Sequence, residues 1–265
     1  MILAAHVFGP DDGPPVLALH GVRNHGRRFR RLAVDAFPTS RVIAPDLRGH
    51  GQSGWEPPWD VDTHAADVLA TLDAVGVADP VEIVAHSFGG LVACRVAACA
   101  PERVRSLTLL DPAAGLDPGV CAAAAAADLA GDGRASSWSS RREAEEAWIA
   151  VRPPSGHWAR DEDLDAFLAR GDDGRYRLRF SRAAAIAAWS EMARPVPNLG
   201  PWRGPVTLVT ADREPYLTDA LRRMFRDACG PLLTEVGIDS GHILMWDAPE
   251  EAARVVARAR PPARR

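Results

Sequence analysis

The fold is decided by the stretch VEIVAHSFGGLV at residues 81–92. Its first part is apolar and β-branched, which predicts a buried strand over 81–84. Residues 91–100 form a helix-favouring run, and Ser87 stands between the two segments. Such a strained turn requires close approach of neighbouring backbone, and small residues surround this serine: Ala85, Gly89 and Gly90. The stretch therefore predicts a strand, a tight turn and a helix, with Ser87 at the apex.

The residues around Ser87 follow the pattern Gly-x-Ser-x-Gly, with Ala85 in place of the first glycine. Alanine is the smallest substitute for glycine, so the departure is mild. The pattern places a nucleophilic serine at the end of a strand. The alternative is that Ser87 only caps the helix that follows, a common place for serine. A serine hydroxyl becomes a good nucleophile when a base takes its proton, so the hypothesis requires a partner histidine.

A candidate partner lies near the C-terminus. Residues 232–236 predict a strand, and the loop that follows closes on Gly241-His242. Pro249 and the two glutamates after it predict the start of a helix, because proline and acidic side chains suit the first helical turn. A loop at the tip of a strand allows the His242 ring to reach the Ser87 hydroxyl. We therefore interpret His242 as a general base.

Two further segments, both in the first 60 residues, directly follow predicted strands. HGV at 20–22 follows the apolar strand predicted at 16–19, and PDLRGHGQS at 45–53 follows the strand predicted at 41–44.

These two segments, the Ser87 turn and Gly241-His242 resemble, in this order, four blocks of the α/β-hydrolase family. The resemblance covers nearly the whole chain. Within the family, the string HGVRNHG at 20–26 and the segment 55–59 are similar to those of small actinobacterial lipase/esterase-like hydrolases. The resemblance implies an α/β-hydrolase fold, with a mostly parallel central sheet flanked by helices and an inserted helical cap. It also implies that the backbone N–H groups of Val22 and Phe88 form the oxyanion hole.

The carboxylate that would orient His242 is open among three residues. In most members of the family it follows the strand equivalent to 206–210, and there Glu214 stands immediately before a proline. Asp111, in the loop after an earlier strand, occupies the other location known in the fold. Asp212 lies very near the end of its strand. We rank Glu214 first, Asp111 second and Asp212 third; the alternative for Glu214 is an exposed loop acid.

Predicted strands and helices alternate in two blocks, which favours a parallel sheet with helices on both faces. Strands are predicted at 2–7, 16–19, 41–44, 81–84, 106–110, 206–210 and 232–236, and helices of these blocks at 27–36, 61–75, 91–100 and 218–228. Between the blocks the helical candidates are 121–130, 141–151, 161–170 and 182–193, with a weak strand pattern at 176–180. We therefore predict an α/β core formed by 1–115 and 201–265, and a helical cap inserted at 116–200.

The composition is that of an ordinary globular chain of 265 residues, 47% hydrophobic and 25% charged. Its 31 basic and 35 acidic residues give a net charge of −4, which offers no sign of binding to nucleic acid or anionic membranes. No apolar run reaches the ~18 residues of a membrane span, and no secretory signal is evident. We expect a cytoplasmic protein with no integral membrane contact.

Cysteine and histidine spacing gives no sign of a metal site. The four cysteines show neither a metal-ligand pattern nor Cys-x-x-Cys. We expect reduced, structural thiols, as in cytoplasmic proteins, and neither a metal nor another cofactor.

These observations predict a serine hydrolase that cleaves small-molecule carboxylic esters through an acyl-enzyme on Ser87. Serine at this position argues against dehalogenases and epoxide hydrolases, which use aspartate. A lactonase or a C–C bond hydrolase on the same residues is an alternative, and so is a weakly catalytic ligand-binding homologue, because a fold does not guarantee activity. The natural substrate and the oligomeric state are not predicted. Four tryptophans of the cap are candidates for an acyl pocket or for the cap's own core: Trp138, Trp148, Trp158 and Trp189.

Overall fold

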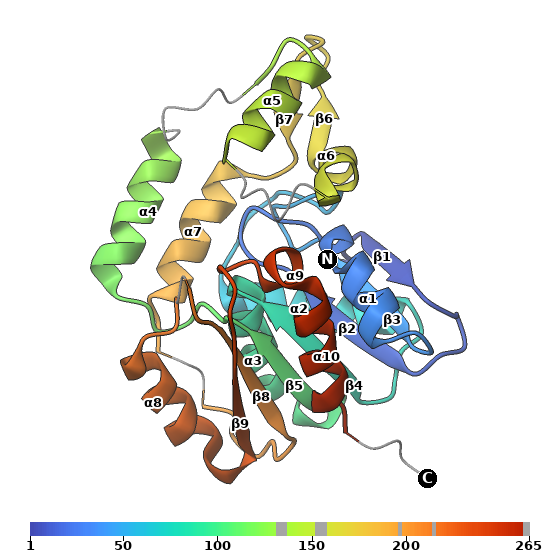
Figure 1. The fold of residues 1–265 in the computed structure, drawn as a ribbon, viewed down its shortest axis with the longest axis vertical. Coiled ribbons are helices and arrows are strands. Elements are labelled where there is room, and N and C mark those ends of the chain that lie inside the picture. The colour runs from blue at the N-terminus through green and yellow to red at the C-terminus, as the bar shows by residue number, and fades with distance from the viewer. Residues whose placement is uncertain (131–136, 152–157, 196–197, 214–215, 262–265) are drawn as a thin grey trace.

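A seven-stranded sheet lies at the centre of the molecule (Figure 1). The strand order is β1-β3-β2-β4-β5-β8-β9, and neighbouring strands are parallel except β1 and β3 at one edge. The computed structural model describes residues 1–130, 137–151, 158–195, 198–213 and 216–261. The predicted, mostly parallel sheet is confirmed. Its strands are β1 (Ala5–Phe8), β2 (Pro15–Leu19), β3 (Arg41–Pro45), β4 (Val81–His86), β5 (Val104–Leu110), β8 (Val206–Ala211) and β9 (Leu233–Ile238).

The central strand β4 is buried along its whole length. Its successive side chains point to opposite faces of the sheet, so Ile83 and Ala85 join one hydrophobic cluster and Val84 joins the other. A parallel strand covered on both faces needs apolar residues at consecutive positions. This explains why the sequence before Ser87 is a nearly continuous apolar run.

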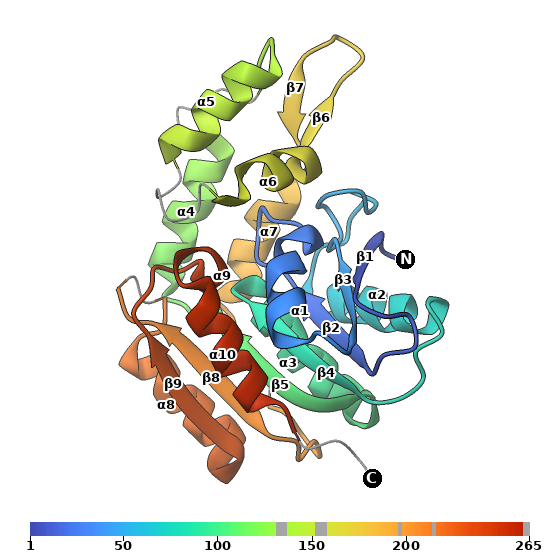
Figure 2. The ribbon, with the colours of Figure 1, turned by 45° about the vertical axis from the view of Figure 1, so that its right-hand side comes forward.

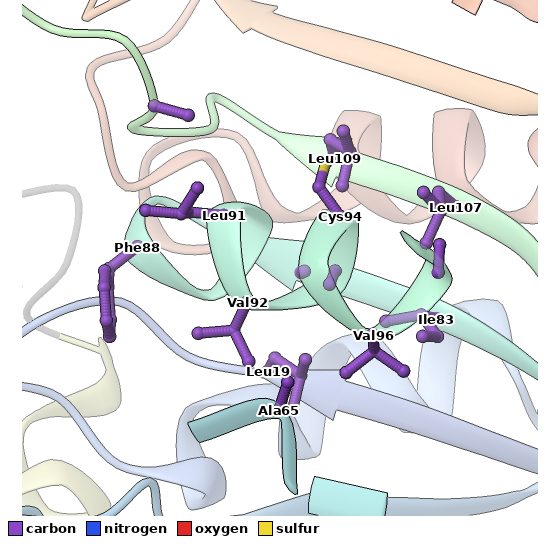
Figure 3. Close-up of a cluster of buried hydrophobic side chains, with 14 of the residues drawn as sticks. Leu19, Ala65, Ile83, Phe88, Leu91, Val92, Cys94, Val96, Leu107 and Leu109 are labelled. Carbon is purple, nitrogen blue, oxygen red and sulfur yellow. The ribbon is translucent and has the colours of Figure 1, made fainter. Parts of the chain in front are cut away.

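Helices cover both faces of this sheet (Figures 1 and 2). One face carries α2 (Val61–Ala74), α3 (Phe88–Cys99) and α8 (Asp219–Cys229), and the other carries α1 (Arg30–Ala36) and α10 (Pro249–Ala259). The helix after Ser87 packs directly on the sheet (Figure 3), so the turn between β4 and α3 is held from both ends. Buried side chains of α3 meet those of three strands: Leu91, Cys94 and Val96 with Leu19, Ile83, Leu107 and Leu109. Shorter elements complete this part of the chain: η1 (Gly26–Phe29), η2 (Pro101–Arg103), η4 (Gly230–Leu232) and α9 (Leu244–Asp247).

The segment between β5 and β8 stands at one end of the sheet (Figures 1 and 2). Its described part contains α4 (Pro118–Ala130), α5 (Arg141–Val151), α6 (Arg160–Phe167), the hairpin β6 (Leu168–Arg170) and β7 (Tyr176–Leu178), and α7 (Arg182–Met192). The helix predicted at 161–170 is too long, because its last three residues pair with β7 across a tight turn at Gly174 (φ 75°). The division into a core (1–115 and 201–265) and a cap (116–200) stays a prediction.

A buried carboxylate joins this segment to the sheet domain. Asp163 of α6 accepts hydrogen bonds from Arg28 Nε at 2.7 Å, His25 Nε2 at 2.8 Å and Trp148 Nε1 at 2.5 Å. Burial alone would raise the pKa of Asp163, but the Arg28 guanidinium and the His25 hydrogen bond hold it below its usual range. The carboxylate is therefore charged, and the contacts of α5 and α6 with η1 depend on a fully paired buried ion.

The described residues contain no helix that is both long and apolar enough to cross a membrane. All four cysteines are free thiols: Cys94, Cys121 and Cys229 are buried, and Cys99 is exposed.

Candidate active site

Ser87 occupies the sharp turn between β4 and α3. Its φ of 55° lies in the left-handed region, which is costly for a residue with a side chain. Backbone hydrogen bonds hold it there: its N–H donates to Leu110 O at 3.1 Å, and its carbonyl accepts from Gly90 and Ala113 at 2.9 and 3.0 Å. The side chain makes no cap hydrogen bond to α3. The helix-cap explanation of this serine is therefore not supported.

Two glycines make this turn sterically possible. A Cβ atom on Gly89 would lie 2.3 Å from the carbonyl oxygen of Leu19, and one on Gly21 would lie 2.8 Å from Ser87 Cβ. Neither position has room for a methyl group. The loop after β2 consequently lies directly against Ser87, as the HGV segment at 20–22 led us to expect.

His242 is hydrogen-bonded to a buried carboxylate. Its Nδ1 lies 2.5 Å from Asp111 Oδ2, and Asp111 is fully buried in the loop after β5. A carboxylate at Nδ1 fixes the ring orientation and leaves Nε2 unprotonated, as a general base requires. Among the described acids, the structure thus brings the second-ranked candidate to His242.

Of the other two candidate acids, the structure describes Asp212, which is not bonded to His242. Asp212 is exposed, and it accepts a hydrogen bond from the Thr210 hydroxyl at 3.1 Å. Glu214, which the sequence ranked first, lies outside the described residues. Its part therefore stays a prediction that mutation must decide.

Two rings enclose the imidazole of His242. The centroid of Tyr216 lies 4.3 Å from that of His242, and the centroid of His86 lies 4.7 Å away. His86 Nε2 also bonds to the carbonyl oxygen of His242 at 2.9 Å. Burial and the nearby His242 lower the pKa of His86 to about 3, so His86 is neutral and donates through Nε2–H. No sequence motif pointed to the contacts of His86 and Tyr216 with His242.

The two residues expected to supply oxyanion donors both lie beside Ser87. Phe88 is the first residue of α3, and Val22 follows Gly21 in the loop that lies against Ser87. Within the part of the chain that the structure describes, neither backbone N–H has a hydrogen-bond acceptor. Unpaired amides are uncommon in protein interiors, and two of them beside a candidate nucleophile are free to bind an oxyanion.

A cavity of about 720 Å³ opens at these residues, and both Ser87 and His242 border it. Three of the four tryptophans between residues 116 and 200 line it: Trp138, Trp148 and Trp189. Trp158 lies elsewhere, with its indole N–H donating to Trp246 O at 3.2 Å. The wall also contains Arg23 and Asp128 of α4, whose carboxylate accepts from Arg23 Nη1 at 2.8 Å and from Trp189 Nε1 at 2.7 Å.

The described residues include no cluster of three or more histidine, cysteine, aspartate or glutamate side chains that would suit a metal ion. What the arrangement offers instead is a serine on a strained turn, a histidine oriented by a carboxylate, and two free backbone donors. These are the groups that acyl transfer requires.

Burial keeps several histidines near the site neutral, which predicts acid sensitivity. It lowers the pKa of His50 to about 4 and those of His64 and His86 to about 3, from an ordinary 6.5. Between these values the unfolded chain binds protons that the folded chain does not, so stability is complete above pH 6.5 and falls below it. At pH 5 each such ring costs about 2 kcal/mol of unfolding free energy. Carboxyls with lowered pKa values, such as Asp46, act only below about pH 4.

We therefore expect the free energy of unfolding to fall by roughly 5 kcal/mol between pH 7 and pH 5, as measured by urea titration at each pH. The variant His64→Leu removes one buried ring. Between pH 7 and pH 5 its free energy of unfolding should therefore fall by about 2 kcal/mol less than that of the wild type. A stability that is constant from pH 7 to pH 5 would show that these rings are not neutral in the folded protein.

Sequence and fold both resemble those of known hydrolases. Residues 14–249 match the family model of the alpha/beta hydrolase fold. Lipase LipV of Mycobacterium tuberculosis is 38% identical over 261 residues, which cover 97% of this chain and 97% of that protein. The solved structure of an E-2-(acetamidomethylene)succinate hydrolase aligns with a TM-score of 0.82 at 22% identity, over 97% of this chain and 94% of its own. A marine microorganism esterase also reaches 0.82, at 21% identity over 98% and 99% of the two chains. At these identities, the two structures show likeness of fold alone.

Proposed function

Because this chain belongs to the α/β-hydrolase fold family, we propose that it is a serine hydrolase of carboxylic esters with Ser87, His242 and Asp111 as its catalytic triad. The observation that carries the proposal is the 2.5 Å contact between His242 Nδ1 and Asp111 Oδ2, with Ser87 and His242 bordering one cavity. The similarity to Lipase LipV over 97% of both chains supports an ester as substrate.

In the acylation step, His242 Nε2 takes the Ser87 proton while Oγ attacks the ester carbonyl carbon. The carbonyl oxygen gains a negative charge, and the N–H groups of Val22 and Phe88 stabilise it. Asp111 stabilises the imidazolium that forms. His242 then gives its proton to the leaving alcohol as the C–O bond breaks, and the acyl group stays on Ser87.

In the second step, water replaces the alcohol. His242 Nε2 takes a proton from the water, the hydroxide oxygen attacks the acyl carbon, and Ser87 Oγ leaves with the proton that His242 returns. The ring faces of Tyr216 and His86 limit rotation of His242 between the two steps, since both lie within 5 Å of its centroid. The acyl group would occupy the cavity between the sheet and α5, where Trp138 and Trp148 supply apolar surface.

Two measurements test this proposal together. One is labelling with a fluorophosphonate, and the other is hydrolysis of a series of p-nitrophenyl esters from short to long acyl chains. We expect one label per chain, on the tryptic peptide that contains Ser87, and ester hydrolysis whose chain-length profile separates an esterase from a lipase. Labelling without hydrolysis of any ester would favour a C–C bond hydrolase on the same residues. Ligand binding without labelling would identify a non-catalytic homologue and reject the proposal.

A further inference from the structure

Two buried histidines that the proposed mechanism does not use flank the Gly21–Arg23 loop beside Ser87. His20 and His50 are each 1% exposed, and their rings meet edge to face with centroids 5.2 Å apart. They come from different parts of the chain, His20 from the end of β2 and His50 from the turn after β3. Buried polar rings are costly unless their nitrogens are bonded, so the partners of each nitrogen are informative.

Backbone partners determine where the proton of His20 sits. The N–H of Leu47 lies 2.8 Å from His20 Nε2, and an amide N–H can only donate, so Nε2 accepts. Burial, with a contribution from His50, lowers the pKa of His20 well below its ordinary value. The ring is therefore neutral and carries its proton on Nδ1, which donates to the carbonyl oxygen of Gly21 at 2.7 Å.

The proton of His50 is determined in the same way. The N–H of Arg23 donates to His50 Nε2 at 3.0 Å, and His50 Nδ1–H donates to the carbonyl of Arg48 at 3.0 Å. Both histidines carry their proton on Nδ1, but they bind the loop through different ring nitrogens. His20 holds a carbonyl of the loop through Nδ1, whereas His50 holds an N–H of the loop through Nε2.

These two bonds fix both peptide units of Val22. The Gly21 carbonyl belongs to the same peptide unit as the Val22 N–H, and in a trans peptide the two groups point in opposite directions. A bond to the carbonyl therefore also sets the direction of the N–H. The bond to Arg23 N–H fixes the following peptide unit, at a residue whose φ of 54° is unfavourable without support.

We propose that His20 and His50 are positioning residues that hold the Val22 N–H in the direction of the oxyanion. They touch no reacting atom and act through the backbone of the loop. The inference rests on the proposed function, and it makes a backbone donor testable: the Val22 N–H cannot be deleted by side-chain mutation, but the two rings that orient it can be replaced.

Substitution by asparagine or glutamine can replace one histidine ring nitrogen at a time. The amide of asparagine lies near the position of Nδ1, and the amide of glutamine, which is further from the backbone, lies near the position of Nε2. At position 20, His20→Asn places an N–H near Nδ1 and keeps the bond to Gly21, whereas His20→Gln keeps only the acceptor for Leu47. At position 50 the roles reverse. There His50→Gln keeps the acceptor for Arg23 N–H, and His50→Asn keeps only the donor to Arg48.

We expect His20→Gln and His50→Asn to slow fluorophosphonate labelling of Ser87 and to lower kcat/KM by roughly 10- to 100-fold, less than the full loss of an oxyanion donor. The partner variants His20→Asn and His50→Gln should lose at most about fivefold. The Ki of a trifluoromethyl ketone, which forms an oxyanion with Ser87, should rise in parallel with the loss of kcat/KM, while KM changes little.

The opposite preferences at the two positions are the decisive result. Equal losses in both variants of a position, or losses that follow Tm while the Ki stays constant, would assign these rings to packing alone and overturn the inference. If the variants of one position do not fold, the two variants of the other position still show whether the loss depends on which ring nitrogen is replaced. An unlabelled wild-type protein would reject the proposed function and this inference with it, whereas a labelled wild type without the reversed pattern rejects the inference alone.

Discussion

Replacing Ser87 by alanine is expected to lower kcat for ester hydrolysis by up to about 10⁶-fold, as the loss of the nucleophile does in other triads. The substitution removes only the Oγ atom. Alanine has the same Cβ as serine and meets the same strain at φ 55°, and the side chain makes no cap hydrogen bond that would be lost. The fold should therefore be preserved, and the loss of rate should report chemistry.

The measurement is kcat/KM on the ester that the wild type cleaves fastest, with Tm measured in parallel. Ser106→Ala is a matched control, because Ser106 is also a buried serine on a neighbouring strand, β5, but lies away from the cavity. We expect that control to keep wild-type activity. If Ser87→Ala retained a tenth of the wild-type rate, Ser87 would not be the nucleophile.

Replacing Asp111 by asparagine should lower kcat by roughly 10⁴-fold with little change in KM. The amide has nearly the shape of the carboxylate, but its N–H₂ group favours the wrong tautomer of His242, with the proton on Nε2. The ring then faces Ser87 with a proton instead of a lone pair. The negative charge that stabilises the imidazolium is lost as well, and Asp111 is fully buried, so solvent cannot replace it.

The control for Asp111 is the same change at the other two candidate acids. We expect Asp212→Asn to keep kcat within about threefold of wild type, because Asp212 is hydrogen-bonded to Thr210 and an acid that does not touch His242 contributes little to the barrier. The proposed triad predicts the same small effect for Glu214→Gln. A large loss in Glu214→Gln with normal activity in Asp111→Asn would confirm the ranking that the sequence favoured and reject Asp111 as the acid of the triad. Comparable losses in both would mean that the two carboxylates share the role.

The sheet and the Ser87 turn were predictable because their signals are local. The apolar run before Ser87 and the small residues around it specify a buried parallel strand and a sharp turn within twelve positions. Strand pairs from β2 to β9 follow from the alternation of strands and helices, since parallel strands need a crossover helix. The helix predicted at 161–170 failed at its end because β6 forms only when β7 is present to pair with it.

Local patterns gave no basis for knowing which acid contacts His242. Asp111 and His242 are 131 positions apart, and they meet only because β5 and β9 end on the same edge of the sheet with β8 between them. Three carboxylates lay in loops where the acid of a triad could stand, and the residues around each of them gave no information about its distance from His242. The same reason hid Tyr216, whose ring contact with His242 has no counterpart in sequence spacing.

The sequence by itself determined which residue types stand where: a serine on a turn, a histidine on a late loop, and strands that must be covered on both faces. Those features depend on short-range sterics and on apolar patterning, which act within a few residues. Only the tertiary structure decided which groups meet: Asp111 with His242, His20 and His50 with the two peptides of Val22, and three of four tryptophans with the cavity. Contacts of this kind arise from strand order and helix packing. Local sequence patterns carry no information about the spatial distance between residues that are far apart in the chain.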